Sequence, residues 1–234
     1  ANATLAGPRA RYVLAALAPR LALDTAAFPV MTMREADIAG IPARLFRIGF
    51  SGELSYEINV PADRGLELWE RLVAAGREHD IAPYGTEAMH VLRAEKGYFM
   101  VGHETDGSVS PVDLGLGRML AQDKDFLGKR ALRRAELVRP DRRQLVGLVP
   151  DDPQFVLPEG AALIAADDPS APIVGHVTSS YFGARIGRAF ALALVKGGRA
   201  RHGERVWAPL GERSVAARLA SPLFYDPEGR RRDG

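Results

Sequence analysis

Residues 47–60 limit what this chain can fold into more than any other stretch. They read Arg-Ile-Gly-Phe-Ser-Gly-Glu-Leu-Ser-Tyr-Glu-Ile-Asn-Val. Gly49 and Gly52 bracket two residues, so the backbone between them can take the sharp turns that other residues avoid. From Leu54 onward apolar and polar residues alternate, which is the period of a strand with one buried face. The stretch therefore predicts a strand, a sharp turn and a second strand that carries Glu57 on its polar face.

Glu57 admits two interpretations. A carboxylate held on a stiff strand can accept two N–H donors side by side from a planar ligand, and an ionised acceptor makes the stronger bonds. The commoner role of a glutamate on the polar face of a strand is simply to be solvated. The alternation by itself leaves both open.

Composition excludes several classes of protein. The chain has 234 residues, of which 47% are hydrophobic and 26% charged, as in ordinary globular domains. A formal net charge of +2 gives no reason to expect a nucleic-acid or membrane partner. The chain has no cysteine, which rules out disulfides and thiolate chemistry and fits a cytoplasmic location. No apolar run reaches membrane-spanning length.

The first 139 residues mix helices and strands. Apolar spacing and breakers predict helices over 8–18, 63–79, 86–97 and 126–137, and strands over 30–39, 42–49, 54–60 and 98–101. In the second helix the spacing puts Leu66, Trp69, Leu72 and Val73 on a buried stripe, so Trp69 is expected in the core. Residues 102–116 are expected to form a loop of functional character.

The pattern of the chain changes after residue 140. Six short candidate strands follow, separated by glycine and proline turns: 145–149, 161–165, 173–179, 188–195, 205–207 and 214–219. Such regular short strands are typical of a small β-barrel or double-sheet roll. The expected fold class is therefore α+β, with an antiparallel sheet and helices in a domain over 1–139 and a β-barrel domain over 140–234.

Familiar cofactor motifs are missing. Lys129 follows a glycine, but Asp123 stands where a phosphate loop needs its first glycine. Gly115 and Gly117 resemble the start of a dinucleotide fingerprint, but Leu120 replaces the third glycine. The five histidines have no metal-ligand spacing, so no metal site is expected.

Four segments in order resemble one family. Residues 47–60 resemble the signature of the folate-binding aminomethyltransferase, or T-protein-like, family, and residues 84–97, 102–107 and 125–130 agree with it in order and spacing. Within this family the sequence most resembles the C-terminal part of the alpha subunits of heterotetrameric sarcosine oxidases. The resemblance runs from about Leu5 to the end of the chain. The resemblance implies a partial aminomethyltransferase-like domain followed by a C-terminal barrel.

The resemblance also implies a function. In such oxidases the amine is oxidised at a flavin on another subunit, and flavin and NAD are expected only elsewhere in the parent complex. The one-carbon unit then reaches tetrahydrofolate, which is the cofactor expected here, and forms 5,10-methylenetetrahydrofolate. Other subunits of a hetero-oligomeric oxidase are the expected partners, and the piece alone is not expected to oxidise an amine.

The resemblance implies roles in the folate pocket for five residues. Glu57 matches the carboxylate that hydrogen-bonds the pterin ring, and Phe50 matches an aromatic pocket position that is often tyrosine, so its hydroxyl is lost here. Arg93 matches the pocket arginine, whereas His103 and Glu104 match the loop that borders the pocket. No catalytic residue is expected among them, because the family's key aspartate would lie upstream of this fragment.

Several alternatives remain open at this point. Arg93 could instead form an ion pair with Glu95 or Glu87. The chain could belong to a glycine-cleavage aminomethyltransferase or to the C-terminal region of a dimethylglycine dehydrogenase-like protein. An alternative of another class is a non-catalytic assembly or accessory module with an idle folate site. RNA-modification accessory proteins of this fold carry a cysteine that residues 96–104 lack, which argues against that group.

Overall fold

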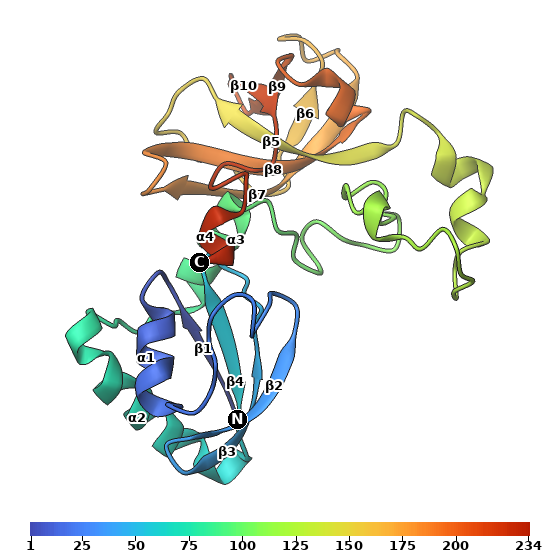
Figure 1. Ribbon diagram of the computed structural model, residues 1–234. Coiled ribbons are helices and arrows are strands. Elements are labelled where there is room, and N and C mark those ends of the chain that lie inside the picture. The colour runs from blue at the N-terminus through green and yellow to red at the C-terminus, as the bar shows by residue number, and fades with distance from the viewer. The chain divides into compact units, whose positions relative to one another are not determined.

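The computed structural model describes residues 1–234, and the chain divides into two compact units (Figure 1). The first unit comprises residues 1–92 and 226–234, and the second comprises residues 93–225. The expected domain boundary between residues 139 and 140 stays a prediction. The fold class is confirmed, because the chain contains an antiparallel sheet with helices and a closed barrel of six strands.

The first unit is built on a four-stranded antiparallel sheet in the order β1-β4-β3-β2. The strands are β1 (Asn2–Ala6), β2 (Met33–Ile38), β3 (Ile41–Phe46) and β4 (Ser55–Asn59). The predicted alternation over residues 54–60 is confirmed, since Tyr56 and Ile58 have no exposed surface and Glu57 is half-buried on the other face. β4 is therefore an interior strand with one face in the core.

Two helices pack against this sheet. They are α1 (Ala10–Leu17) and α2 (Gly65–Gly76), and short 3₁₀ turns at Ala62–Arg64 and Arg77–His79 extend α2 at both ends. Leu14 of α1 and Leu68 of α2 belong to the same buried cluster as Leu45 and Ile58 of the sheet. Burial of these side chains supplies the main driving force for the unit.

The predicted buried stripe of α2 is wrong in part. Leu66 is 71% exposed and Trp69 is 49% exposed, whereas Leu68, Leu72 and Gly76 are buried. The buried row runs at i, i+4 and i+8, and it ends where Gly76 lets Ile81 approach to 2.6 Å from the place a Cβ would occupy. The spacing of the large side chains predicted a different row, on a neighbouring part of the helix surface.

Arg47, the first residue of the glycine-bracketed stretch, has a structural role. Its side chain is 1% exposed and donates hydrogen bonds to the carbonyl of Phe28 and, at 2.5 Å, to the carbonyl of Asp233. Asp233 ends the short helix α4 (Arg230–Asp233). The guanidinium therefore ties the last residues of the chain to the first unit.

The second unit is a closed barrel in the strand order β10-β5-β8-β7-β6-β9. Its strands are β5 (Arg143–Pro150), β6 (Ala162–Ile164), β7 (Ile173–Gly183), β8 (Arg188–Lys196), β9 (Arg205–Leu210) and β10 (Arg213–Ala220). All six predicted strands are present. Valine, alanine and leucine side chains fill the interior of the barrel.

The segment between the sheet and the barrel departs from expectation. α3 (Thr86–Glu95) is present, and the expected strand over 98–101 is reduced to one bridge between Val101 and Thr105. The predicted helix over 126–137 is wrong, because only the 3₁₀ turns Ala131–Arg133 and Ala135–Val138 form there. Leu127 is fully exposed, so the apolar positions of this stretch have no surface against which an amphipathic helix could pack.

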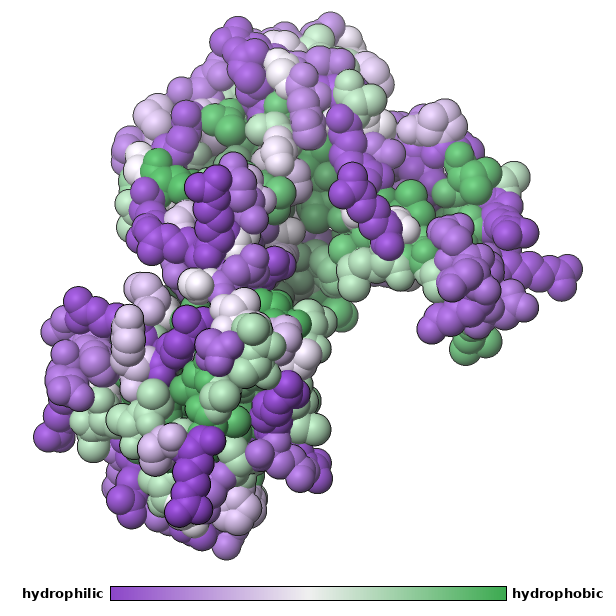
Figure 2. All heavy atoms as spheres, in the orientation of Figure 1, coloured by the Kyte–Doolittle hydropathy of each residue, from purple (hydrophilic) through white to green (hydrophobic).

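The surface is largely hydrophilic. Figure 2 shows purple side chains over most of the visible face of both units, as expected with 26% charged residues. None of the helices combines the length and apolar character that crossing a bilayer requires.

Candidate functional site

Glu57 lies at the centre of the first unit's sheet. It pairs in register with Thr4 of β1 on one side and with Phe46 of β3 on the other. Hydrogen-bonded strands on both sides fix the height and direction of its side chain. The half-buried carboxylate is thus presented to a ligand by a rigid scaffold rather than by a loop.

Tyr84 is a neighbour of Glu57 that reasoning from the sequence missed. Its ring is 42% exposed in the loop that precedes α3. Burial raises the pKa of the Tyr84 phenol, and the negative charge of Glu57 raises it further. The charge of the Glu57 carboxylate therefore acts on the Tyr84 phenol, and the two residues offer an anionic acceptor, an aromatic face and a hydroxyl. The available signal was that Tyr84 is the first residue of the family-like segment 84–97.

Phe50 lies in the turn that leads into β4 and is half-buried. The turn is tight, because a Cβ on Gly49 would lie 2.4 Å from the Cβ of Ser55. Ser51 and Ser55 are each 4% exposed, and their hydroxyls have no hydrogen-bond partner within the protein. Phe50 is therefore held by a closely packed turn that includes two buried hydroxyls.

A groove of 720 Å³ lies in the same unit. β1, α1, α2 and the loop around residues 79–85 line it, and the exposed ring of Trp69 forms part of its wall together with Tyr84 and Met89. Trp69 is thus a groove residue rather than a core residue. Aromatic and aliphatic walls with a few polar groups are typical of small-molecule sites.

Arg93 and Glu104 come together in the second unit. Arg93 Nη1 lies 2.7 Å from Glu104 Oε2, and both side chains are fully buried. Ser179 of β7 bridges the pair, since it accepts from Arg93 Nη2 and donates to Glu104 Oε1, each at 2.6 Å. The backbone N–H of Met100 also donates to Glu104. The ion pair considered for Arg93 exists, but its partner is Glu104 rather than Glu95 or Glu87.

His103 lies beside this network, on the loop between α3 and the barrel. Its Nδ1 is 3.7 Å from Glu159 Oε1, and about a third of its side chain is exposed. The structure thus groups the predicted residues in two sets. Glu57 and Phe50 lie in the first unit, and Arg93, His103 and Glu104 lie in the second. No group of three or more histidine or acidic side chains is arranged to hold a metal ion.

Two family models match successive parts of the chain. Residues 1–124 match the GCVT N-terminal domain, and residues 143–226 match the glycine cleavage T-protein C-terminal barrel domain. The chain belongs to the glycine cleavage T-protein family. The expectation of a T-protein-like chain is thereby confirmed.

Relatives of this T-protein family member include sarcosine oxidase subunits. The chain is 46% identical to sarcosine oxidase subunit alpha of Corynebacterium sp. (strain U-96), over 100% of this chain and 25% of that protein. It is 44% identical to sarcosine oxidase subunit alpha of Rhizobium meliloti (strain 1021), over 99% of this chain and 24% of that protein. The chain therefore spans about a quarter of the alpha subunits that it matches.

Aminomethyltransferases are also similar. The protein of that name from Moorella thermoacetica is 33% identical over 96% of this chain and 59% of its own length. The solved structure of glycine cleavage system aminomethyltransferase T from Bartonella henselae superposes with a TM-score of 0.79 and 26% identity, over 94% of this chain and 58% of that one. The sheet-and-helix unit followed by a barrel is thus a known combination.

Proposed function

We propose that this chain is the tetrahydrofolate-binding module of a sarcosine oxidase alpha-like subunit. In this proposal it accepts the one-carbon unit released from an oxidised N-methyl amine, and the product is 5,10-methylenetetrahydrofolate. The observation that carries the proposal is the half-buried carboxylate of Glu57 on the interior strand β4, in a chain 44–46% identical to sarcosine oxidase alpha subunits.

The residues around Glu57 fit a reduced pterin. Its ring presents adjacent N–H donors, which an ionised carboxylate can accept side by side. The tyrosine at position 84, whose phenol is affected by the charge of Glu57, offers an aromatic face and a hydroxyl, whereas position 50 is phenylalanine. We assign pterin binding to Glu57 and apolar contact to Phe50.

Tetrahydrofolate, when bound, would supply an N5 amine as the acceptor of the one-carbon unit. The chain's own residues contribute binding and orientation. Holding two reactants in a reactive geometry accelerates their reaction greatly, and this needs no nucleophilic side chain. Arg93, His103 and Glu104 lie in the second unit, and their part in folate binding stays a prediction from the family resemblance. The full burial of the Arg93–Glu104 pair gives these two a further role in holding the loop over residues 98–104 against β7.

The partners proposed are the remaining subunits of a hetero-oligomeric oxidase, where flavin and NAD would be bound, and the compartment proposed is the cytoplasm. Glycine-cleavage aminomethyltransferase is a second candidate, favoured by the similarity to the Bartonella henselae structure. A non-catalytic assembly module is a candidate of another class.

Calorimetric titration with tetrahydrofolate tests the proposal. The chain should show saturable binding that Glu57→Ala abolishes. Glu35→Ala is the matched control, because Glu35 is an exposed carboxylate on β2 of the same sheet. Equal binding by both variants would contradict the assignment of Glu57. A folded chain that binds no folate, alone or within its full-length parent, would favour the assembly module.

A further inference from the structure

A second cavity, far from Glu57 in the sequence, lies in the barrel unit. It has a volume of 310 Å³, and its floor is the outer face of β5, β7 and β8. The loops around residues 106–109 and 136–142 form its walls. The proposed folate site uses none of the residues that line this cavity.

Two cations stand side by side on the floor of the cavity. Arg143 begins β5 and Lys196 ends β8, and the two residues are directly opposite in the antiparallel register. Like charges directly opposite on neighbouring strands destabilise a sheet. Neither side chain makes a hydrogen bond or an ion pair within the protein. The sheet thus keeps a repulsive pair that an anion would neutralise.

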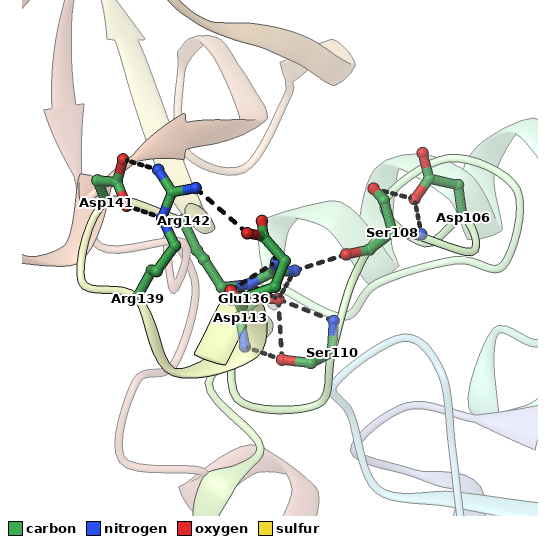
Figure 3. A network of polar contacts seen from close by, with 8 residues as sticks. All are labelled: Asp106, Ser108, Ser110, Asp113, Glu136, Arg139, Asp141 and Arg142. Atoms are coloured by element: carbon green, nitrogen blue, oxygen red, sulfur yellow. Dashed lines mark hydrogen bonds and ion pairs between the residues drawn. The ribbon is translucent and has the colours of Figure 1, made fainter. Parts of the chain in front are cut away.

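Other arginines hydrogen-bond the carboxylates in the wall of the cavity (Figure 3). Arg139 holds Asp141 through two bonds, at 2.6 and 2.9 Å, and also contacts Glu136 at 3.2 Å. Arg142 holds Asp113 at 2.7 Å and lies 3.7 Å from Glu136. These ion pairs close the wall of the cavity, and Arg143 and Lys196 interact with Asp106 and Asp141 through charge without a direct ion pair.

Asp106 and His176 complete the lining. The Asp106 carboxylate accepts two hydrogen bonds from Ser108, from its N–H at 2.8 Å and its hydroxyl at 2.6 Å. His176 lies on β7, half-buried beside Arg143 and Asp106, and can donate a ring N–H. The residues that line the cavity include four arginine and lysine side chains and three carboxylates, so the lining carries one excess positive charge.

We propose that this cavity binds a phosphate group, either free phosphate or the phosphate of a small hydroxylated ester. The guanidinium fork of Arg143 and the ammonium of Lys196 bind the oxyanion from neighbouring strands, and His176 donates a further hydrogen bond. Asp106 faces them and accepts from a hydroxyl of the ligand or from a protonated phosphate oxygen. The volume accommodates a phosphate with a few additional heavy atoms.

The test uses inorganic phosphate and glycerol 3-phosphate as probes, titrated into the whole chain at low salt and followed by ³¹P NMR line broadening. We expect a dissociation constant on the order of 1 mM. Arg143→Gln and Lys196→Gln should each weaken binding about tenfold, because each removes a charge-assisted bond. Arg134→Gln and Lys124→Gln change exposed cations outside the cavity and should leave binding unchanged.

Asp106→Asn distinguishes the two sources of the phosphate. For free phosphate, the loss of a nearby negative charge should tighten binding. For a hydroxylated ester, glycerol 3-phosphate should bind more tightly than phosphate to the wild type, and Asp106→Asn should remove that advantage. Binding that is absent at tens of millimolar, or equally weakened by the control variants, would overturn the proposal. All the variants change exposed side chains, and an unchanged thermal midpoint verifies that they fold.

Discussion

Arg93 and Glu104 form an ion pair at 2.7 Å in which neither side chain has any exposed surface. Ser179, 86 residues further along than Arg93, hydrogen-bonds both partners. Arg93 matches a ligand-binding position of the family, and in the structure it also links the end of α3 to the barrel strand β7. Its two guanidinium Nη atoms are already occupied.

Removing one member of this pair should be costly. Glu104→Gln leaves Arg93 as a buried charge without a counter-ion, and breaking such a pair costs about 3–5 kcal/mol. Urea unfolding followed by circular dichroism measures the loss. Asp80→Asn is the control, because Asp80 pairs with Arg9 at 2.9 Å in solvent, where pairs contribute no more than about 1 kcal/mol. Similar losses for the two variants would contradict the structural role of the buried pair.

Gly175 should not tolerate a side chain. A Cβ at this position would lie 2.3 Å from the carbonyl oxygen of Leu194 on the neighbouring strand, and this backbone atom cannot move without distorting the barrel. Gly175→Ala is expected to destabilise the chain by about 1–3 kcal/mol. Gly117→Ala is the matched control, because no atom lies within 4 Å of its Cβ position. Thermal unfolding of the two variants measures the difference, and equal midpoints would refute the expectation.

The link between Glu57 and Tyr84 can be measured by spectroscopic titration. Burial is the larger cause of the raised pKa of Tyr84 and the charge of Glu57 the smaller. Glu57→Gln should therefore lower the pKa of Tyr84 but leave it above the usual value of about 10. Ultraviolet titration against a Tyr84→Phe reference isolates this phenol. Glu35→Gln should leave the pKa of Tyr84 unchanged. If Glu57→Gln also leaves it unchanged, the charge of Glu57 does not act on the Tyr84 phenol.

His176 should make the barrel sensitive to mild acid. Burial, followed by the charge of Arg143, lowers the pKa of His176, and Asp106 opposes them. The unfolded chain therefore takes up a proton at a higher pH than the folded one. Stability should be constant above about pH 6.5 and should fall as the pH decreases through that value towards the lower folded pKa.

Unfolding measured from pH 7.5 to 5.5 without phosphate tests this sign. His176→Gln should flatten the slope, and Asp106→Asn should steepen it, because Asp106 is the group that favours the protonated ring. A slope that survives His176→Gln unchanged would assign the acid sensitivity to another group.

Local patterns in the sequence predicted much of the fold. The alternation after Leu54 identified β4 and placed Glu57 on the face away from the core, because side chains of a strand alternate whatever the rest of the chain does. The six short barrel strands were found for the same reason. Motif order identified the family without any knowledge of contacts.

The predictions from apolar spacing were wrong where a helix depends on another surface to pack against. The helix expected over 126–137 has apolar residues at helical intervals, but Leu127 remains exposed and the helix does not form. Trp69 was placed in the core on spacing and size, although the row Leu68, Leu72 and Gly76 is the one that meets the sheet unit's interior. Periodicity marks a face of a helix, but tertiary packing decides which face is covered.

The sequence by itself determined the family, the strand that carries Glu57 and the positions of the barrel strands along the chain. Only the tertiary structure exposed Tyr84 to the charge of Glu57, joined Arg93 to Glu104 and Ser179, set the order of the strands in the barrel, and placed Arg143 opposite Lys196. The physical reason is the range of the interactions. Periodicity and turns are set by neighbours along the chain, whereas ion pairs, perturbed pKa values and cavities depend on residues that only the closed fold brings within a few ångströms.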